Sequence, residues 1–471
     1  MQFAGLDFGP NGPFLLLSAP RRRDDSEEQH ISKAQRYWAL PSVAEHGLRE
    51  QLTNEIHARP PVAVSAPTRV SHLALLSGEG SVEADRRHVC ELCRRFGGAE
   101  PGVGANYWQV DLGTFQLNWE RHTEFSTCTF FRSEPFTEPF RDRAIDQVPQ
   151  DWLEALNGEV LVAIHLALEP ASAPERSNQE LHALFASDYI AGSMVSGGSA
   201  LVWSDFRLQG DGFSRFLVRD ISLGHRQAGR LVQRLLEIET YRMMALLAFP
   251  LARSIGGEVT QAEAELGKLT DRLRSSDDDS DRVLLGELTR LSAEVERLAA
   301  TSNYRFSAAR AYYALVQRRI RELREERFGG RAPIHEFMER RLAPAIRTCE
   351  STQERLSVLS ERVSRAANLL RTRVDVALEQ QNRDLLASMN RRAQLQLRLQ
   401  ETVEGLSVVV LSYYLVGLLN YGLKALKQAG AGLDPTLWTG IGLPFVVFGV
   451  WFASRRLRHR AMDRDGASDP P

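Results

Sequence analysis

The chain has 471 residues, a formal net charge of −2 at pH 7 and 43% hydrophobic residues. This length has room for two or three domains, and the near-neutral charge argues against general nucleic-acid binding. An ordinary hydrophobic content predicts a mainly water-soluble chain in which any membrane segment is small. Four cysteines suit a reducing compartment.

Residues 1–40 are mixed in composition and are predicted to form a flexible N-terminal arm. The short apolar run at 13–20 is followed, not preceded, by the arginine cluster at 21–23, which is the reverse of a secretory signal. We therefore expect the large N-terminal part to remain in the cytoplasm.

Residues 41–223 are predicted to form a mixed α/β domain. Helices are expected at 48–57, which Pro60 and Pro61 stop, and at 83–96. Short alternating runs and glycine-containing turns indicate the strands. The predicted strands are 70–76, 107–112, 115–120, 125–132, 160–168, 201–208 and 212–220.

Cys90 and Cys93 form a C-x-x-C pair inside the second predicted helix. They have no second cysteine pair and no histidine at zinc-site spacing, so no metal site is predicted. Val89, Leu92 and Phe96 share their helix face, which favours two small core residues.

From residue 224 to residue 403 the pattern is helical, and this segment is predicted to be a stalk. Helices are expected at 231–247, at 283–327 and from 334 into the first apolar run, with Gly329, Gly330 and Pro333 between the last two. Two sets of residues recur every seven positions, as in coiled coils. They are Leu356, Val363 and Leu370, and then Leu378, Leu385, Leu399 and Leu406, with Arg392 interrupting. Packing of 283–327 against 334–403 within the chain and self-association are both compatible with this spacing.

Two charge-free runs near the C-terminus, at 405–423 and 435–454, predict a transmembrane hairpin over 404–456. Each run is about 30 Å long as a helix, which matches the hydrocarbon core of a bilayer. Arginines precede the first run and follow the second. The positive-inside rule therefore places both termini in the cytoplasm, with 457–471 as a cytoplasmic tail. The alternative is a buried hairpin of a soluble protein. The expected fold class is α+β.

Four segments and the final hairpin resemble a bacterial family of predicted membrane-anchored proteins of unknown function. The segments are NEIHARP at 54–60, VSHLA at 70–74, WERHTEF at 119–125 and RLLEIETYRMMA at 234–245. The resemblance implies a location in the bacterial inner membrane and supplies no biochemistry.

The expected architecture also resembles, more distantly, that of CorA-type divalent-cation channels. In that family a cytoplasmic α/β domain is joined by stalk helices to a first span that ends in a Gly-Met-Asn motif. Here the corresponding place holds Asn420, Tyr421 and Gly422, so the motif is absent.

Tyr413, Gly417 and Asn420 form one stripe of the first apolar run and are the candidate pore-lining residues. In a ring of subunits the Asn420 amide and the Tyr413 hydroxyl would face a pore. The alternative is that Gly417 permits close helix contact and Asn420 lies near the membrane interface.

His57, Arg59, Glu120, His122 and Glu124 are the candidate ligand-binding residues of the α/β domain. Glu120, His122 and Glu124 are predicted to alternate along one strand and so to share a face. Histidine and carboxylate together suit metal binding or acid/base chemistry, but a solvated or hydrogen-bonded face has the same pattern. Two ion pairs, Arg234 with Glu237 and Glu239 with Arg242, are expected on the helix that follows.

We therefore expect a membrane-anchored, non-enzymatic protein with a ligand- or partner-binding domain on a helical stalk. No catalytic residue, metal site or resident cofactor is predicted. The expected partners are the lipid bilayer and further copies of the chain, with no nucleic acid. The alternative function is a CorA-like oligomeric channel that conducts a divalent cation.

Overall fold

The computed structural model describes residues 46–49, 52–53, 61–78, 82–275, 278–428 and 434–465. The fold is α+β, and the chain divides into two compact units. The first contains the described residues up to Glu239 together with Arg319–Ile334, and the second contains Thr240–Arg318 and everything from His335 onward. The first unit therefore extends past the predicted boundary at residue 223.

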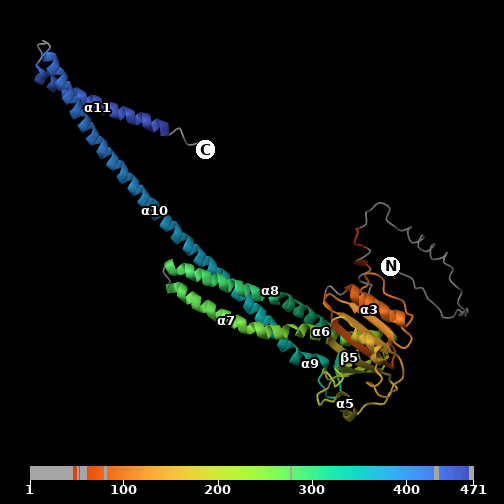
Figure 1. Ribbon diagram of the computed structural model, residues 1–471. Coiled ribbons are helices and arrows are strands. Elements are labelled where there is room, and N and C mark those ends of the chain that lie inside the picture. Colours follow the sequence, from red (N-terminus) through yellow and green to blue (C-terminus); the bar gives the residue numbers. More distant parts are fainter. Residues whose placement is uncertain are drawn as a thin grey trace, which may run out of the picture. The chain divides into compact units, whose positions relative to one another are not determined.

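A nine-stranded sheet is the centre of the first unit (Figure 1). Its strand order is β2-β3-β4-β1-β5-β8-β7-β6-β9. Only β5 and β8 pair in parallel among the ladders of the described chain, so the sheet is predominantly antiparallel. The strands are β1 (Thr68–Leu76), β2 (Tyr107–Asp111), β3 (Gln116–Arg121), β4 (Ser126–Arg132), β5 (Glu159–Glu169), β6 (Ala191–Val195), β7 (Ala200–Ser204), β8 (Ser214–Asp220) and β9 (Glu326–Arg327).

The predicted strands are confirmed, with ends that shift by a few residues. A hairpin through Gln209–Gly210–Asp211 joins β7 to β8, with the Gln209 amide donating to the Phe213 carbonyl at 2.9 Å. Strand β6 was missed, because its glycine and serine resemble a loop in the sequence. Strand β9 was predicted as the end of a helix. It pairs with β6 although the two strands are far apart in the chain. A sequence pattern that spans a few residues cannot predict such a contact.

Helices cover the sheet where alternation makes one face apolar. Helix α3 (Val82–Arg95) buries Val89 and Leu92 against Leu117 and Trp119 of β3. The shorter helical segments of this unit are η3 (Ala144–Gln147), α4 (Gln150–Glu154) and α5 (Asn178–Phe185). Cys90 and Cys93 are both buried on α3, which confirms that they are core residues.

Helix α6 (His225–Leu246) begins where the predicted stalk begins and passes from the first unit into the second. Its first half packs closely enough that Gly229 touches the backbone of Val62: a Cβ on Gly229 would lie 1.7 Å from the Val62 carbonyl oxygen. A hydrogen bond from the Val64 amide to the His225 carbonyl, at 3.2 Å, also joins the segment that contains Val62 to the start of α6.

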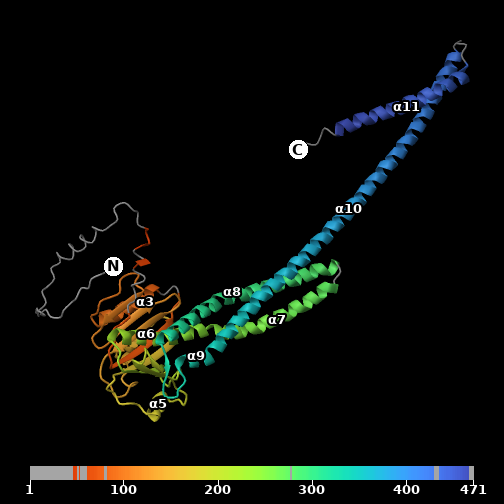
Figure 2. The same cartoon turned by 180° about the vertical axis from the view of Figure 1, so that it is seen from behind.

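The helices after α6 are α7 (Ala248–Ser275), α8 (Asp278–Leu323), α9 (Ile334–Arg341), α10 (Ala343–Gln428) and α11 (Pro435–Asp465). Helices α7 and α8 lie side by side with the first part of α10 in both ribbon views (Figure 1, Figure 2), and α11 lies beside the end of α10. One apolar core joins α7, α8 and the first part of α10, ending at Leu370. The expected packing of 283–327 against 334–403 is therefore confirmed for the part of α10 up to Leu370. Helix α7 shares the core, and α10 is exposed from residue 378 to residue 403.

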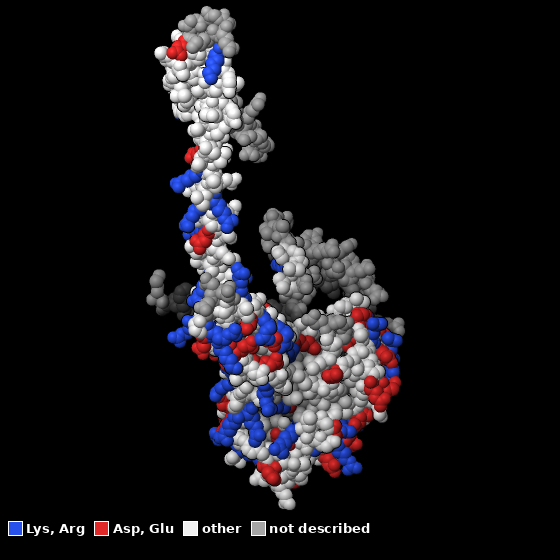
Figure 3. Space-filling view, turned by 60° about the vertical axis from the view of Figure 1, so that its left-hand side comes forward, with Lys and Arg blue, Asp and Glu red and all other residues white. Residues whose placement is uncertain are grey.

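The predicted apolar runs lie within α10 and α11. Both helices contain a stretch long and apolar enough to cross a membrane, with mean hydropathy of 1.7 and 1.6 over the most apolar part. Only 6% of each stretch is buried in the chain, so neither is a core helix of a soluble domain. Figure 3 shows this end of the second unit as largely free of charged side chains.

Candidate functional site

A polar layer lies on one face of the sheet, at the side formed by β1, β4, β3 and β2. On β3, Leu117 and Trp119 point to the α3 core, so Asn118 and Glu120 point to the opposite face. The strand register places Asn118 beside Thr129, and Thr129 beside His72. In the next row Glu120 lies opposite Tyr107.

We call this layer the polar sheet cluster. It comprises His72, Tyr107, Asn118, Glu120, His122, Thr129 and Glu237. Close contacts join five of these residues. His72 Nδ1 and Thr129 Oγ1 are 2.8 Å apart, Asn118 donates its amide N–H to Glu120 Oε1 at 2.9 Å, and His122 Nε2 lies 3.8 Å from Glu120 Oε2.

Burial dominates the electrostatics of the cluster. His72 is 5% exposed, and burial, with a smaller contribution from His122, lowers its pKa to about 3, so the ring is neutral at physiological pH. Burial and then the Glu120 carboxylate raise the pKa of Tyr107 to about 12. Desolvation also raises the pKa of Glu237, and the nearby Glu120 adds to this shift. A low-dielectric environment of this kind strengthens any hydrogen bond made inside it.

Glu237 brings α6 to the cluster. Its carboxylate accepts hydrogen bonds from the Arg319 guanidinium and from Gln233 Nε2, the latter at 2.8 Å. Arg319 also donates to Glu322 Oε2 at 2.8 Å. The expected pairing of Glu237 with Arg234 on one helix face is wrong, because Arg234 instead contacts Glu322, 3.3 Å away on α8. The partner came from a remote helix that α6 approaches only in the folded chain.

The sequence-predicted ligand-binding residues are placed as follows. Glu120 lies on β3, but His122 follows the end of that strand at Arg121, and Glu124 lies in the turn before β4. The expectation that all three alternate along one strand is therefore wrong: the His122 amide donates to the Phe125 carbonyl at 2.8 Å and closes the turn. His57 and Arg59 lie outside the described residues.

One atom of the cluster lacks a protein partner. The Asn118 Oδ1 is buried and accepts no hydrogen bond, while Asn118 as a whole is 8% exposed. Buried polar atoms are nearly always satisfied, so an unpaired oxygen is uncommon, and Asn118 Oδ1 is one of eight such side-chain atoms among the described residues. Within the described ranges, no three His, Cys, Asp or Glu side chains are arranged to hold a metal ion.

A second buried histidine was not singled out in the sequence. His165 on β5 is 2% exposed, its Nδ1 lies 3.0 Å from Ser71 Oγ, and its ring stacks on Phe213 at 3.8 Å. Its Nε2 lies 3.9 Å from Asp211 Oδ2, beyond hydrogen-bond distance. Burial lowers the pKa of His165 to about 3.

Ser71, His165 and Asp211 have the residue types of a hydrolytic triad but not its accessibility. Ser71 is fully buried on β1, an inner strand of the sheet, and its oxygen accepts a hydrogen bond from the Ile145 amide at 3.2 Å. A substrate carbonyl has no route to that hydroxyl, whereas a triad needs an exposed nucleophile. A histidine inside an apolar strand gives too weak a signal for sequence reasoning to find it.

The candidate pore residues lie on α10. Tyr413 is 77% exposed, and Gly417 and Asn420 are half-buried. An apolar groove between α10 and α11 is lined from α10 by Leu411, Leu415, Leu418 and Gly422, among others. At 100° per residue, the Tyr413–Gly417–Asn420 stripe lies about half a turn around α10 from that groove. The stripe therefore does not line the groove between α10 and α11.

The chain is thus of the class that combines a nine-stranded α+β unit with a unit of long helices ending in an apolar helical pair. It belongs to the family described as "Protein of unknown function (DUF3422)", whose model matches residues 44–461. This confirms the resemblance to a family of unknown function. Neither the curated proteins nor the solved structures contain a significant match to the chain.

Proposed function

We propose that the protein is anchored in the bacterial inner membrane by the α10–α11 hairpin and carries its sheet unit in the cytoplasm. The observation that supports this most strongly is the continuity of α10, which runs unbroken from a water-exposed, charged helix into an apolar stretch. An apolar helix surface of that length is stable in lipid and aggregates in water. The arginines that flank the hairpin favour cytoplasmic termini.

Sedimentation of lysed cells tests the anchorage. The full chain is expected in the membrane pellet after an alkaline carbonate wash and in the supernatant only after detergent is added. A matched pair of variants sharpens the test. Leu415→Arg places a charge in the middle of the first apolar run and is expected to release much of the chain, whereas Leu397→Arg on the exposed stalk leaves it in the pellet. Full-length protein that remains soluble without detergent contradicts the proposal.

The cytoplasmic unit is proposed to bind a small polar ligand or a protein partner without chemical turnover. The polar sheet cluster supports this, because it gathers buried hydrogen-bonding groups around the unpaired Asn118 oxygen without an accessible nucleophile. Mass spectrometry of small molecules released from denatured protein is the test. We expect a ligand in the wild type that is reduced several-fold in Asn118→Leu and unchanged in Asn178→Leu, which alters an asparagine outside the cluster.

Metal analysis distinguishes this proposal from a metal-dependent enzyme. The purified full chain and His122→Ala are expected to contain equally little bound metal, because binding of this kind needs no metal. One metal ion per chain in the wild type that is lost in the variant would favour the enzyme instead.

A second candidate function, an oligomeric channel for a divalent cation, is favoured by the position of the Tyr413–Gly417–Asn420 stripe. The stripe lies away from the groove and is available to neighbouring copies. Cation flux into protein-containing liposomes, together with the mass of the detergent-solubilised particle, tests it. A ring of five chains whose flux is lost in Asn420→Ala favours the channel, and a single-chain particle eliminates it.

A further inference from the structure

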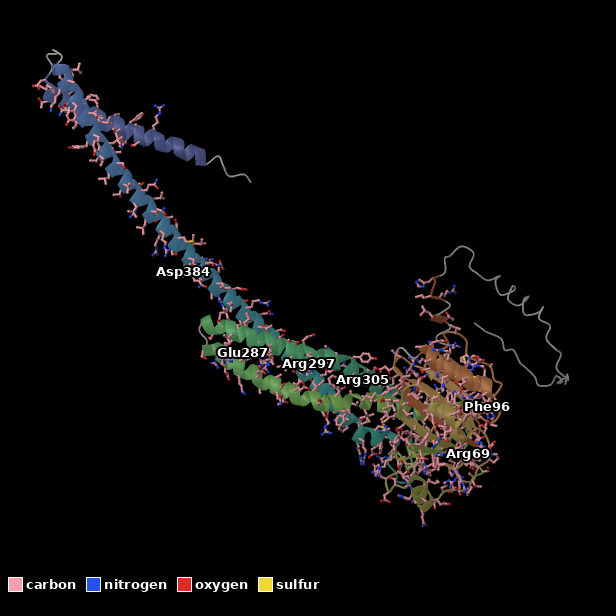
Figure 4. All side chains as sticks on the ribbon, in the orientation of Figure 1. Arg69, Phe96, Glu287, Arg297, Arg305 and Asp384 are labelled. Atoms are coloured by element: carbon pink, nitrogen blue, oxygen red, sulfur yellow. The ribbon has the colours of Figure 1, made fainter. Side chains whose placement is uncertain are left out.

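The seven-residue repeats of α10 fall into two sets with different surroundings. Leu356, Val363 and Leu370 are 2%, 1% and 0% exposed, because they pack against α7 and α8. The second set has no such cover: Leu378, Leu385, Leu399 and Leu406 are 39%, 55%, 67% and 65% exposed. The first set of repeats is therefore buried by packing within the chain, whereas the second set is exposed. Figure 4 shows Asp384 on the stretch of α10 that has passed the ends of α7 and α8.

Charge is distributed around this stretch in the way that a partnered helix requires. At 100° per residue, one group of charged side chains lies at least about 100° around the axis from the leucine stripe. They are Arg383, Asp384, Arg391, Arg398 and Glu401. The second core position of a coiled coil falls four residues after each member of the stripe. Met389 and Val403 occupy it in two heptads, and Asn382 and Gln396 occupy it in the other two. Arg392 is the one charge inside the stripe between residues 380 and 406.

We propose that a second copy of this chain covers the stripe, with the two α10 helices parallel and in register over residues 378–406. The segment is about 43 Å long and holds four heptads, which is enough for a stable coiled coil. The inference deepens the proposed function, because it rests on membrane anchorage by the hairpin.

Anchorage selects a second copy over the other partners that an amphipathic helix can have. Helix α10 is continuous into the apolar run, so a span that crosses the bilayer directs the preceding stretch away from the lipid surface. The stripe therefore does not lie flat in the membrane interface, where isolated amphipathic helices bind. Two copies held in one membrane also have the same orientation and height, so each leucine faces its own counterpart across a two-fold axis.

The parallel arrangement assigns a role to Arg392. In register, the Arg392 guanidinium of one copy meets that of the other, and like charges at a core position destabilise the pair. The association is therefore weaker than that of an all-leucine seam. Replacement of Arg392 by leucine is expected to strengthen it.

Disulfide cross-linking in native membranes tests the interface. The native cysteines Cys90, Cys93, Cys128 and Cys349 are all buried, so an introduced cysteine is the reactive one. Leu385→Cys and Leu399→Cys are expected to form covalent dimers with an oxidant, because equivalent core positions of parallel helices approach within disulfide distance. Arg391→Cys, on the charged side, is the matched control and is expected to yield at least tenfold less dimer.

Each result decides between proposals. A Leu385→Cys chain in the membrane pellet that stays monomeric, that links only to a protein of another size, or that links no better than Arg391→Cys overturns the interface. A chain absent from the pellet instead overturns the anchorage. Arg392→Leu provides a second measurement in the detergent-purified full chain: dimers are expected to persist to at least tenfold lower protein concentration than in the wild type, and unchanged or weaker association contradicts the seam.

Discussion

At the scale of single residues, the two deeply buried histidines have the clearest physical consequence. His72 and His165 both have a pKa of about 3 in the fold, against 6.5 for the free side chain, because burial disfavours the charged ring. The Nδ1 atom of His72 lies 2.8 Å from Thr129 Oγ1 and that of His165 lies 3.0 Å from Ser71 Oγ, whereas the buried Nε2 of His165 has no hydrogen-bond partner among the described residues. Both are therefore fixed structural groups at neutral pH.

The lowered pKa values of His72 and His165 make the free energy of unfolding depend on pH between about pH 3 and pH 6.5. Between pH 6.5 and pH 3 the unfolded chain binds protons at these two positions and the folded chain does not, so the free energy of unfolding falls as the pH is lowered. Each histidine contributes on the order of 1 kcal/mol per pH unit at most. Urea unfolding of the full chain in detergent at pH 7.5, 6.0 and 5.0 measures the slope. His72→Gln, which keeps a partner for Thr129, is expected to reduce it, and an unchanged slope contradicts the assignment.

The buried ion pair between Asp85 and Arg121 is the second residue-scale feature. Their side chains are 5% and 4% exposed, and Arg121 also donates to Ser77 Oγ at 2.8 Å and to the Gly78 carbonyl at 2.7 Å. Asp85→Ala leaves a guanidinium buried without its carboxylate, so we expect a loss of roughly 3–5 kcal/mol in the free energy of unfolding. The control is Glu294→Ala, which removes an exposed ion pair with Arg297 and is expected to cost less than about 1 kcal/mol. Equal losses in the two variants would contradict the prediction.

At the scale of elements, α6 is positioned by close backbone packing. At Gly229 there is no room for a Cβ beside the Val62 carbonyl. A Cβ on Gly267 of α7 would have no neighbouring heavy atom within 4 Å. Each glycine lowers the stability of its helix by a similar amount through its poor helix propensity. The two differ in surroundings, because Gly229 is closely packed and Gly267 is not.

The two glycines therefore give a matched prediction. Gly229→Ala forces α6 away from the sheet unit and is expected to lower the free energy of unfolding by roughly 1–3 kcal/mol or more. Gly267→Ala is expected to raise it by about 0.5–1 kcal/mol through improved helix propensity. Thermal unfolding followed by circular dichroism measures both, and the same sign of change in the two variants would refute the packing argument.

At the scale of the whole molecule, the proposed topology places the connection between α10 and α11 on the far side of the membrane from the sheet unit. Cysteine labelling in intact spheroplasts tests this. Asp434→Cys, next to that connection, is expected to react with a membrane-impermeant maleimide before lysis. Ser388→Cys, on the exposed part of α10, is expected to react only after lysis. The reverse order of reactivity would place the termini outside.

Local pattern determined most of the elements in this chain, because strands and helices are encoded by short-range periodicity. The apolar run at 160–168 predicted β5, and the heptads from residue 356 predicted a long helix. The two charge-free runs predicted helices able to span a membrane, since length and hydropathy are properties of the sequence alone. The four short segments that resemble a family of unknown function also predicted the family correctly.

Only the tertiary structure decided which residues meet. The pairing of β6 with β9, the contact of Glu237 with Arg319 and the approach of Ser71 to His165 join segments remote in sequence. It also decided where the heptads of α10 are buried, because α7 and α8 end before the repeat does. Periodicity fixes the face that a residue occupies, whereas its neighbour across that face depends on how distant segments pack.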